Sequence, residues 1–460
     1  MSAILLIVVP LLAAFISIMF KKAAPYILLL VSFASVVSLN YMPLEVITIG
    51  GFTAPWGINL VLDSYSVIGL YVVNSLFFLV ISLNTVKFKK ISTILLVSLA
   101  GLNGLLLTGD LFNLFVFIEV SGIAAYLITT TNKEPLATFN YLVAGTVGSS
   151  LYLLGLIMLY AMFGTLNMTD MAVRITASGA SASQVAFPFL LMFIGFGVEA
   201  KLLPFNSWAK GILATSNKLS GPMIASVYAA AIGFAFGRLL TSVFVFSNTL
   251  LLVVTILVIL SIVAGEAMAF GASKTREILL FSSIAQAGLV VLVFLQGYIG
   301  WGVFLIIANA AGKLILFVIN NHAVDELKTD DVEDLKGLFV NNKVVGVAFT
   351  VASLSAMGMP LFLGFVVKMN VLGMMFEEGN LLMPAIILIT SVVEGIYFTR
   401  LLVKLWYKED NLPKVEYDFT LKYVVIVVAM LLMAFGMYTA PIENQANDLG
   451  PVTFIERGIL

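Results

Sequence analysis

The sequence predicts an all-α integral membrane protein, and two observations support this prediction. Hydrophobic residues make up 61% of the 460 residues, charged residues only 11%, and the mean hydropathy is +1.09. Because soluble chains carry about 25% charged residues, this composition suits lipid and not water. Apolar runs of about 20 residues, the length of a helix that crosses a bilayer, recur from one end of the chain to the other.

Apolar runs separated by polar breaks predict about fourteen membrane spans. Two of them, 184–218 and 343–378, exceed a straight crossing, since about 36 residues at 1.5 Å each give about 54 Å against a hydrocarbon core of about 30 Å. Pro204 lies in the first and Pro360 in the second, so both helices are expected to be broken. The first run of the chain lacks a preceding basic segment and a cleavage site, which favours a span over a removable signal. In chain order the predicted spans are 3–20, 24–42, 58–85, 91–109, 110–130, 137–163, 184–218, 221–246, 249–271, 276–297, 299–320, 343–378, 383–407 and 419–440.

Basic residues of the loops divide between the two sides of the predicted bundle, and their imbalance predicts its orientation. Cytoplasmic loops are enriched in Lys and Arg. We therefore expect a multi-pass protein of the cell membrane with both termini outside. The inner side carries Lys21, Lys22, Lys87, Lys89, Lys90, Lys133, Lys210, Lys218, Lys274, Arg276, Lys328, Lys336, Lys343, Lys404, Lys408, Lys414 and Lys422, and the outer side carries Arg174, Arg238 and Arg457.

Composition also excludes several functional classes. A net charge of −1 offers no basic surface for nucleic acid, and the absence of cysteine excludes cysteine-ligated iron–sulfur clusters within this chain. The only histidine, His322, begins the stretch "HAVDELKTDDVEDLKGL", which we interpret as a polar connector on the inner side, with a docking surface as the alternative. Histidine-ligated haem is therefore not expected. We predict no cofactor and no metal site, so redox chemistry would belong to a partner.

Charged residues inside the predicted spans are the candidate functional groups. Each costs at least about 2.5–3.5 kcal/mol to insert, so such groups are kept where they pair, line water or carry ions. Structural pairing explains Arg400 and Glu394 as well as function does, since both approach the inner end of their span and could snorkel. Glu266 has a similar structural explanation near Lys274. The groups that favour function are Glu119, Glu199, Lys201, Lys313 and Lys368.

Lysine suits proton relay because burial disfavours its charged form and a nearby carboxylate restores it. Moving the carboxylate away ejects the proton, and moving it back recruits another. A proton that crosses 100 mV stores about 2.3 kcal/mol, which such a change can supply. The row of glutamates and lysines therefore predicts proton translocation.

Five stretches of the sequence form a recognisable set of motifs: "GDLFNLFVFIEVSGIAAYLI", "KLLPFNSWAKGILATSNKLSGPMIAS", "LLFSSIAQAGLV", "NAAGKLILFVINNHAV" and "SLSAMGMPLFLGFVVK". Together they resemble one family, the antiporter-like membrane subunits shared by respiratory complex I, Mrp sodium/proton antiporters and membrane-bound energy-converting hydrogenases. The resemblance covers roughly residues 58–405. It implies fourteen helices, two inverted five-helix repeats, and breaks in helices seven and twelve. The corresponding division is 1–90 for helices one to three, 91–246 and 249–407 for the two repeats, and 408–460 for the last helix and the tail.

The resemblance assigns functional positions and also reveals departures. The family's helix-five glutamate falls on Glu119, its helix-eleven lysine on Lys313, and its helix-twelve lysine or glutamate on Lys368. The slot of the helix-seven lysine holds Glu199, with the lysine displaced to Lys201. The helix-eight group falls near Phe234, which cannot titrate, and the amides at Asn206, Gln286 and Asn309 replace family histidines.

We therefore expect an ion-translocating subunit of a redox-driven or multi-subunit antiporter complex, which moves H⁺, with Na⁺/H⁺ exchange as an alternative. Its expected partners are other membrane subunits and the lipid bilayer, and the resemblance favours the archaeal hydrogenase or sulfur-reducing branch. The rival interpretations are a non-conducting structural paralogue and an autonomous secondary transporter. Whether the complex is an oxidoreductase stays open at this point.

The stretch "GVEAKLLPF" gives one specific expectation. Residues two apart on a regular helix point about 200° apart, which would separate Glu199 from Lys201. Because Pro204 frees the carbonyl of Ala200, the helix is expected to unwind there. Lys201 should then leave the helical face and meet Glu119 or Glu199.

Overall fold

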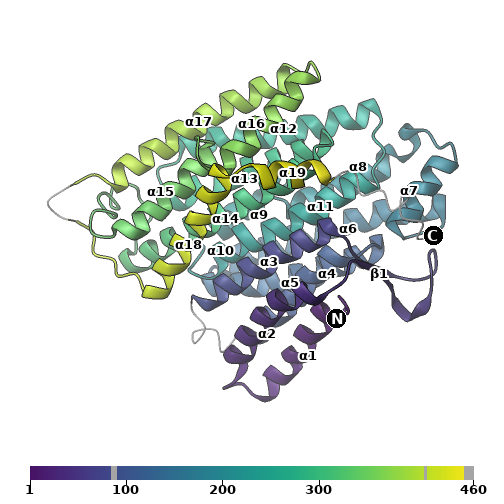
Figure 1. The fold of residues 1–460 in the computed structure, drawn as a ribbon, viewed down its shortest axis with the longest axis horizontal. Coiled ribbons are helices and arrows are strands. Elements are labelled where there is room, and N and C mark those ends of the chain that lie inside the picture. The colour runs from purple at the N-terminus through teal and green to yellow at the C-terminus, as the bar shows by residue number, and fades with distance from the viewer. Residues whose placement is uncertain (84–90, 409–411, 450–460) are drawn as a thin grey trace.

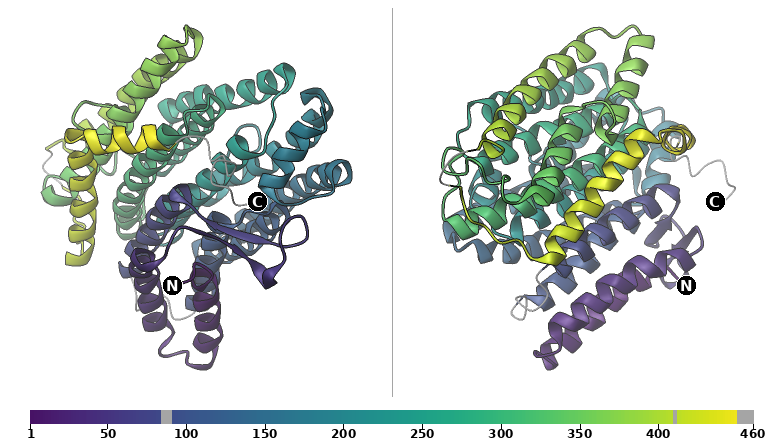
Figure 2. Two further views of the ribbon diagram at one scale, coloured as in Figure 1. Left: turned by 45° about the vertical axis from the view of Figure 1, so that its right-hand side comes forward. Right: turned by 60° about the vertical axis from the view of Figure 1, so that its left-hand side comes forward.

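The computed structural model describes residues 1–83, 91–408 and 412–449, which form a bundle of helices (Figure 1). In Figures 1 and 2 the N-terminal helices (purple) lie at one end of the bundle, the green helices of the later part of the chain at the other, and the middle of the chain between them, whereas the last helix (yellow) crosses the middle of the view in Figure 1. The helices are α1 Leu5–Met19, α2 Ala24–Ser38, α3 Ser64–Ser82, α4 Ser92–Leu107, α5 Leu111–Thr129, α6 Pro135–Phe163, α7 Met168–Ala177, α8 Ala182–Glu199, α9 Ser207–Leu213, α10 Ser220–Pro222, α11 Ala229–Ser242, α12 Asn248–Gly271, α13 Thr275–Leu295, α14 Ile299–Leu327, α15 Lys343–Met357, α16 Leu363–Glu377, α17 Leu382–Leu405, α18 Phe419–Met437 and α19 Ala440–Asp448.

The predicted all-α membrane fold is confirmed. Each of the fourteen predicted segments overlaps one or two of these helices, and eleven helices of the described residues are long and apolar enough to cross a membrane. Three further apolar helices, α1, α4 and α15, are shorter. The number of crossings and the inverted repeat stay predictions. Four of the loop cations used for orientation, Lys87, Lys89, Lys90 and Arg457, and the end of the third predicted span lie outside the described residues.

Several elements depart from the predicted spans. The third span does not begin at residue 58, because β2 (Asn59–Leu62) pairs antiparallel with β1 (Glu45–Thr48) and α3 follows it. Short 3₁₀ turns occur at Leu39–Tyr41 (η1), Ile49–Gly51 (η2) and Thr130–Asn132 (η4), and a π-helix, η5 (Met223–Tyr228), leads into α11. Two amphipathic helices, α7 and α19, were not predicted, since neither carries an apolar run of membrane length.

Two acids, Asp63 and Asp110, cap the helices that follow them. Asp63 Oδ1 accepts a hydrogen bond from the Ser66 N–H at 2.7 Å, and Asp110 Oδ1 accepts one from the Asn113 N–H at 2.7 Å. A carboxylate at this position satisfies an N–H group that has no partner within the helix. These caps explain where α3 and α5 begin.

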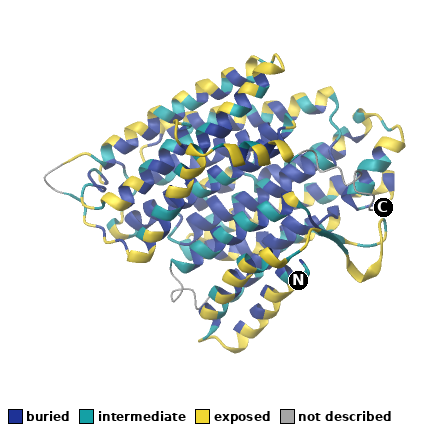
Figure 3. Ribbon diagram, viewed as in Figure 1, coloured by how far each residue is buried: buried dark blue, intermediate teal, exposed yellow. Residues whose placement is uncertain are grey.

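The core of the bundle lies in its middle helices. Most residues of α11, α13 and α14 are buried, whereas the outer helices expose one face (Figure 3). A membrane helix that is apolar all round and buried is surrounded by other helices and does not contact lipid. Polar side chains on α13 and α14 are therefore far from lipid, and the structure has to satisfy them internally.

Both predicted helix breaks are present, and the same motif ends the helix at each. At the end of α8, the Lys201 N–H bonds the Val198 carbonyl at 3.1 Å and the Leu202 N–H bonds the Gly197 carbonyl at 2.8 Å. Lys201 is left-handed, with φ +62°. These two bonds and this conformation define a Schellman motif, in which the left-handed position is usually glycine.

The end of α15 repeats this geometry with a glycine. The N–H of Gly358, which has φ +76°, bonds the Ser355 carbonyl, and the Met359 N–H bonds the Leu354 carbonyl at 3.0 Å. Prolines follow both motifs, Pro204 and Pro360, and neither can continue a helix. The two helix-ending motifs are therefore equivalent and differ in which residue occupies the left-handed position.

Two expectations about polar residues were wrong. His322 is not in a loop, because α14 continues to Leu327, and its buried ring stacks on Tyr417 while Nε2 contacts the Glu416 carbonyl at 2.8 Å. Arg238 is not in an outer loop but is buried in α11, where it donates to Asp63 at 2.8 Å. A single charged residue near a span end does not reveal whether the helix continues past it.

The connector between α14 and α15 packs partly against the helices. Leu335, Leu338 and Phe339 are buried. Ion pairs with Lys336 and Lys404 tie Glu333 in place and lower the pKa of its carboxyl to about 2. The segment is therefore a connector whose apolar side chains from residue 335 onward pack into the core, while Glu333 and Asp334 stay exposed.

Candidate functional site

Lys201 is the first lysine of the site, and the helix break aims it into the bundle. Its side chain is 2% exposed, and Nζ donates to Ser283 Oγ of α13 at 3.1 Å. Because a left-handed residue lies off the helical spiral, the side chain leaves the face that a regular α8 would give it. The segment after it is fixed by Ser261 Oγ of α12, which accepts from the Leu203 N–H at 2.8 Å.

The structure confirms the first half of the expectation for Lys201, and its meeting with an acid stays a prediction. The helix is broken and the lysine leaves the helical face, but within the described residues no ion pair joins it to Glu119 or Glu199. Its hydrogen-bond partner is a neutral hydroxyl on another helix. The left-handed turn carries the side chain toward α13, a neighbour that the sequence spacing does not show.

Lys313 approaches the same helix from the other side. It lies on α14, is 3% exposed, and donates from Nζ to Ser282 Oγ at 2.6 Å. Ser282 and Ser283 are adjacent in α13. Neighbouring residues of one helix point about 100° apart, so consecutive serines can serve lysines on two sides of the same helix.

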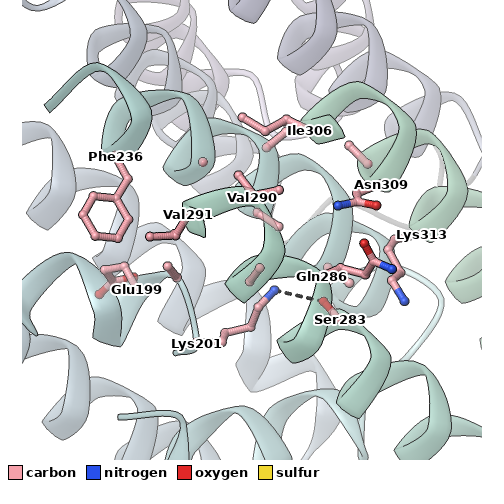
Figure 4. A pocket seen from close by; sticks show the side chains of 17 residues that line it. Glu199, Lys201, Phe236, Ser283, Gln286, Val290, Val291, Ile306, Asn309 and Lys313 are labelled. Atoms are coloured by element: carbon pink, nitrogen blue, oxygen red, sulfur yellow. Dashed lines mark hydrogen bonds between the residues drawn. The ribbon is translucent and has the colours of Figure 1, made fainter. Parts of the chain in front are cut away.

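A cavity connects the two lysines (Figure 4). It holds about 60 Å³ of space for water centres, which is room for roughly four waters. Figure 4 shows Lys201 on one side, Lys313 on the other, and Ser283 and Gln286 between them. Its remaining wall is largely small and apolar, with Glu199 and Asn309 adding polar atoms. Water in this cavity would touch both lysines.

Lys368 of α16 and its partner Glu394 of α17 extend the site beyond Lys313. Its Nζ donates to Glu394 Oε2 at 2.8 Å and to the Ala356 carbonyl, which the broken end of α15 leaves free, at 2.8 Å. Gln286 Nε2 of α13 donates to Glu394 Oε1 at 2.8 Å. Helix α13 thus contacts groups of all three lysine centres through Ser282, Ser283 and Gln286.

An acid and tyrosine cluster lies on the other side of the break. Glu119 of α5 and Glu199 of α8 face each other closely enough to interact electrostatically. A Cβ on Gly145 of α6 would lie 1.8 Å from the Tyr126 hydroxyl and 3.1 Å from Glu199 Oε1, so glycine leaves the space that these two oxygens share. Tyr228 of η5 adds a second hydroxyl, which contacts Ser98 at 2.6 Å.

The structure brings the five predicted site residues into one row but changes their partners. Glu394, which we considered able to snorkel, is 1% exposed and is the counter-ion of Lys368. Glu266 is buried and does not pair with Lys274, which pairs with Asp330 at 3.5 Å. Arg400 is exposed and bonds the Phe270 carbonyl at 2.7 Å, as snorkelling predicts.

Sequence reasoning also missed the serines of α13. Their only signal was the pair "SS" in a buried span, and serine is common in packed membrane helices. At the family's helix-eight position, Phe234 is fully buried and stacks edge-on against Tyr65 at 5.5 Å. Within the described residues, no three His, Cys, Asp or Glu side chains converge as ligands for a metal ion. The site's chemistry therefore rests on amines, carboxylates and hydroxyls.

These groups can pass protons. An ammonium donates, a carboxylate accepts, and a hydroxyl does both, so a hydroxyl between two titratable groups can hand a proton along. Amides such as Gln286 orient their neighbours but do not change charge. The arrangement is a chain of buried titratable groups joined by hydroxyls and by space for water.

Comparison with known proteins gives consistent results. The family described as "NADH:quinone oxidoreductase/Mrp antiporter, TM" matches residues 108–394. The chain is 27% identical to a Na⁺/H⁺ antiporter subunit of Bacillus subtilis over 98% of both chains, and 28% identical to an NADH-quinone oxidoreductase subunit of Desulforudis audaxviator over 86% of this chain and 84% of that one. Its structure resembles a chain of the membrane-bound sulfane sulfur reductase, an archaeal respiratory membrane complex, with a TM-score of 0.89 and 28% identity over 97% of this chain and 96% of that one.

Proposed function

This chain belongs to the NADH:quinone oxidoreductase/Mrp antiporter transmembrane family, and from that membership we propose that it conducts protons as a membrane subunit of a larger complex. The observation that carries the proposal is the cavity that Lys201 and Lys313 share. It supplies a lateral connection between the two predicted repeats, 91–246 and 249–407, although Phe234 stands where the family has a titratable group.

The proposed path has three stages. Glu119 and Glu199, surrounded by tyrosines, deliver a proton to Lys201. Water in the cavity and the adjacent serines of α13 pass it to Lys313. From there it reaches the Lys368–Glu394 pair beside the second helix break, where an open carbonyl and a movable lysine are suited to gating exchange with the outside.

We further propose that the partners are other membrane subunits, because the relatives named above are subunits of antiporter, quinone oxidoreductase and sulfur reductase complexes. Both termini are proposed to lie outside, on the distribution of loop cations. The chain has no cysteine, so labelling of a single introduced cysteine shows on which side of the membrane that position lies. An impermeant maleimide should label Asn248→Cys in intact cells and leave Glu134→Cys unlabelled; the reverse pattern would overturn the orientation.

Replacing the central lysine tests the proposed conduction. In membrane vesicles that contain the assembled complex, Lys313→Met should lower proton translocation at least about tenfold, since it removes the group that carries the proton while keeping a side chain of similar length. The control, Lys343→Ala, removes an exposed lysine at the start of α15 and should leave the flux unchanged. Assembly is checked by co-purification of the partner subunits.

The rival functions give different results in the same assay. Wild-type flux in Lys313→Met would favour a non-conducting spacer. Transport by the purified chain alone in liposomes would favour an autonomous transporter. The row of charges favours conduction, because a solute transporter would need polar groups gathered around a cavity shaped for its substrate, and the shared cavity here is small and largely apolar.

A further inference from the structure

Glu266 is a buried acid that the proposed path does not use. It lies within α12, its side chain is 4% exposed, and Oε2 has no hydrogen-bond partner. Within the described residues it forms no ion pair. Leaving a buried oxygen unpaired is costly, so a group kept here needs an explanation beyond packing.

Charged and titratable groups from three helices face Glu266. They are Glu394 and Tyr397 of α17, Lys368 of α16 and Lys313 of α14. Lys368 is already bound to Glu394 at 2.8 Å. Lys313 donates only to the neutral Ser282. Glu266 is thus the acid of this cluster without a cation, and Lys313 is the cation without an acid.

Hydroxyl groups fill the interval between these two residues. The Tyr397 side chain is fully buried, and its hydroxyl lies within reach of both Ser282 and Glu266. It makes no hydrogen bond of good geometry to either. Ser282 in turn accepts from Lys313 Nζ at 2.6 Å. The order of groups is therefore amine, serine hydroxyl, tyrosine hydroxyl and carboxylate.

We propose that Glu266 receives the proton that Lys313 releases, through Ser282 and Tyr397. This inference rests on the proposed function, because it adds an acceptor to the proton path. An N–H bond of the Lys313 ammonium breaks as an O–H bond forms on Ser282. The serine passes its own proton to Tyr397, and the tyrosine passes its proton to Glu266 Oε2, so both hydroxyls end as they began.

The transfer leaves two neutral groups where an ammonium and a carboxylate stood, and the net charge of the cluster does not change. No counter-ion has to enter the membrane interior, where an unpaired charge is costly. Lys313 is then ready for the next proton from the cavity. The second half of the site would hold one proton on Glu266 while the Lys368–Glu394 pair exchanges another.

Infrared difference spectroscopy on the lipid-reconstituted complex reads the proposed proton directly. Between high and low pH, the wild type should show a carbonyl stretch of a protonated carboxylic acid that is lost in Glu266→Gln. Glu277→Gln, which removes an acid that pairs with Lys210 near the surface, should keep the band. A band that persists in Glu266→Gln would overturn the proposal.

Transport assays test the hydroxyl route. Tyr397→Phe keeps the ring and should lower proton flux by more than about tenfold, whereas Tyr417→Phe, at another buried hydroxyl without a partner, should not change it. Wild-type flux in Tyr397→Phe would also overturn the proposal. If instead Lys313→Met conducts normally while Glu266→Gln still loses the infrared band, the proposed conduction fails and the protonation of Glu266 stands.

Discussion

The Lys368–Glu394 pair is the most deeply buried ion pair of the described residues, with side chains 9% and 1% exposed. Two opposite charges in an apolar interior gain little net stability over apolar side chains of similar size, but removing one of them leaves the other unpaired at a cost of about 3–5 kcal/mol. Such a pair is therefore poor evidence for stability and better evidence for a charge that the protein uses.

A double-variant cycle separates these roles. Glu394→Leu should destabilise the protein by about 3–5 kcal/mol, because Lys368 loses its counter-ion. Adding Lys368→Met should recover most of that loss, as measured by thermal unfolding of the purified complex, and should not restore proton flux. Glu326→Gln, at an exposed pair with Lys218, is the control and should leave stability nearly unchanged. A double variant that conducts like the wild type would make the pair purely structural.

For single residues, the sequence predicted which lysines belong to the site but not which groups they contact. A lysine in the middle of an apolar run is recognisable from its cost, and Lys313 and Lys368 were predicted as site residues. Glu394 was misread because distance along a span does not tell which face it occupies. Its partners come from α16 and α13, and only the packed structure brings these helices together.

Helix breaks are the elements that aim the lysines. Excess length and a proline predicted both breaks, and both are present. The left-handed lysine at the first break was not predictable, because glycine is the residue that usually takes this position. A non-glycine residue in this conformation costs about 1–2 kcal/mol, and strain of this kind gathers at functional sites.

Replacing Lys201 with glycine should therefore separate stability from function. Lys201→Gly relieves the left-handed strain, so the melting temperature of the complex should not fall, whereas proton flux should be lost with the amine. Lys133 has nearly the same conformation, with φ +64°, on an exposed turn. Lys133→Gly should preserve both stability and flux. Normal flux in Lys201→Gly would show that proton conduction needs the helix break but not the amine of Lys201.

The whole molecule is organised around α13. This helix is buried over most of its length and presents Ser283 to the first half of the site and Ser282 and Gln286 to the second. Hydropathy predicted α13 as a span but not as the meeting point, since the apolar periods of fourteen helices do not specify which ones are neighbours. Strand β1, α7 and α19 were missed because they lie outside the long apolar runs, whereas β2 was included in the third predicted span.

The central claim is that protons cross from Lys201 to Lys313 through the shared cavity, and filling that cavity tests it most directly. Ala287 lines it, and Ala287→Leu should displace the water while keeping both lysines. The control, Ala434→Leu, adds the same bulk at an exposed position of α18. In vesicles with the assembled complex, we predict that Ala287→Leu loses proton flux at least about tenfold and that Ala434→Leu does not. Wild-type flux in an assembled Ala287→Leu complex would contradict the account.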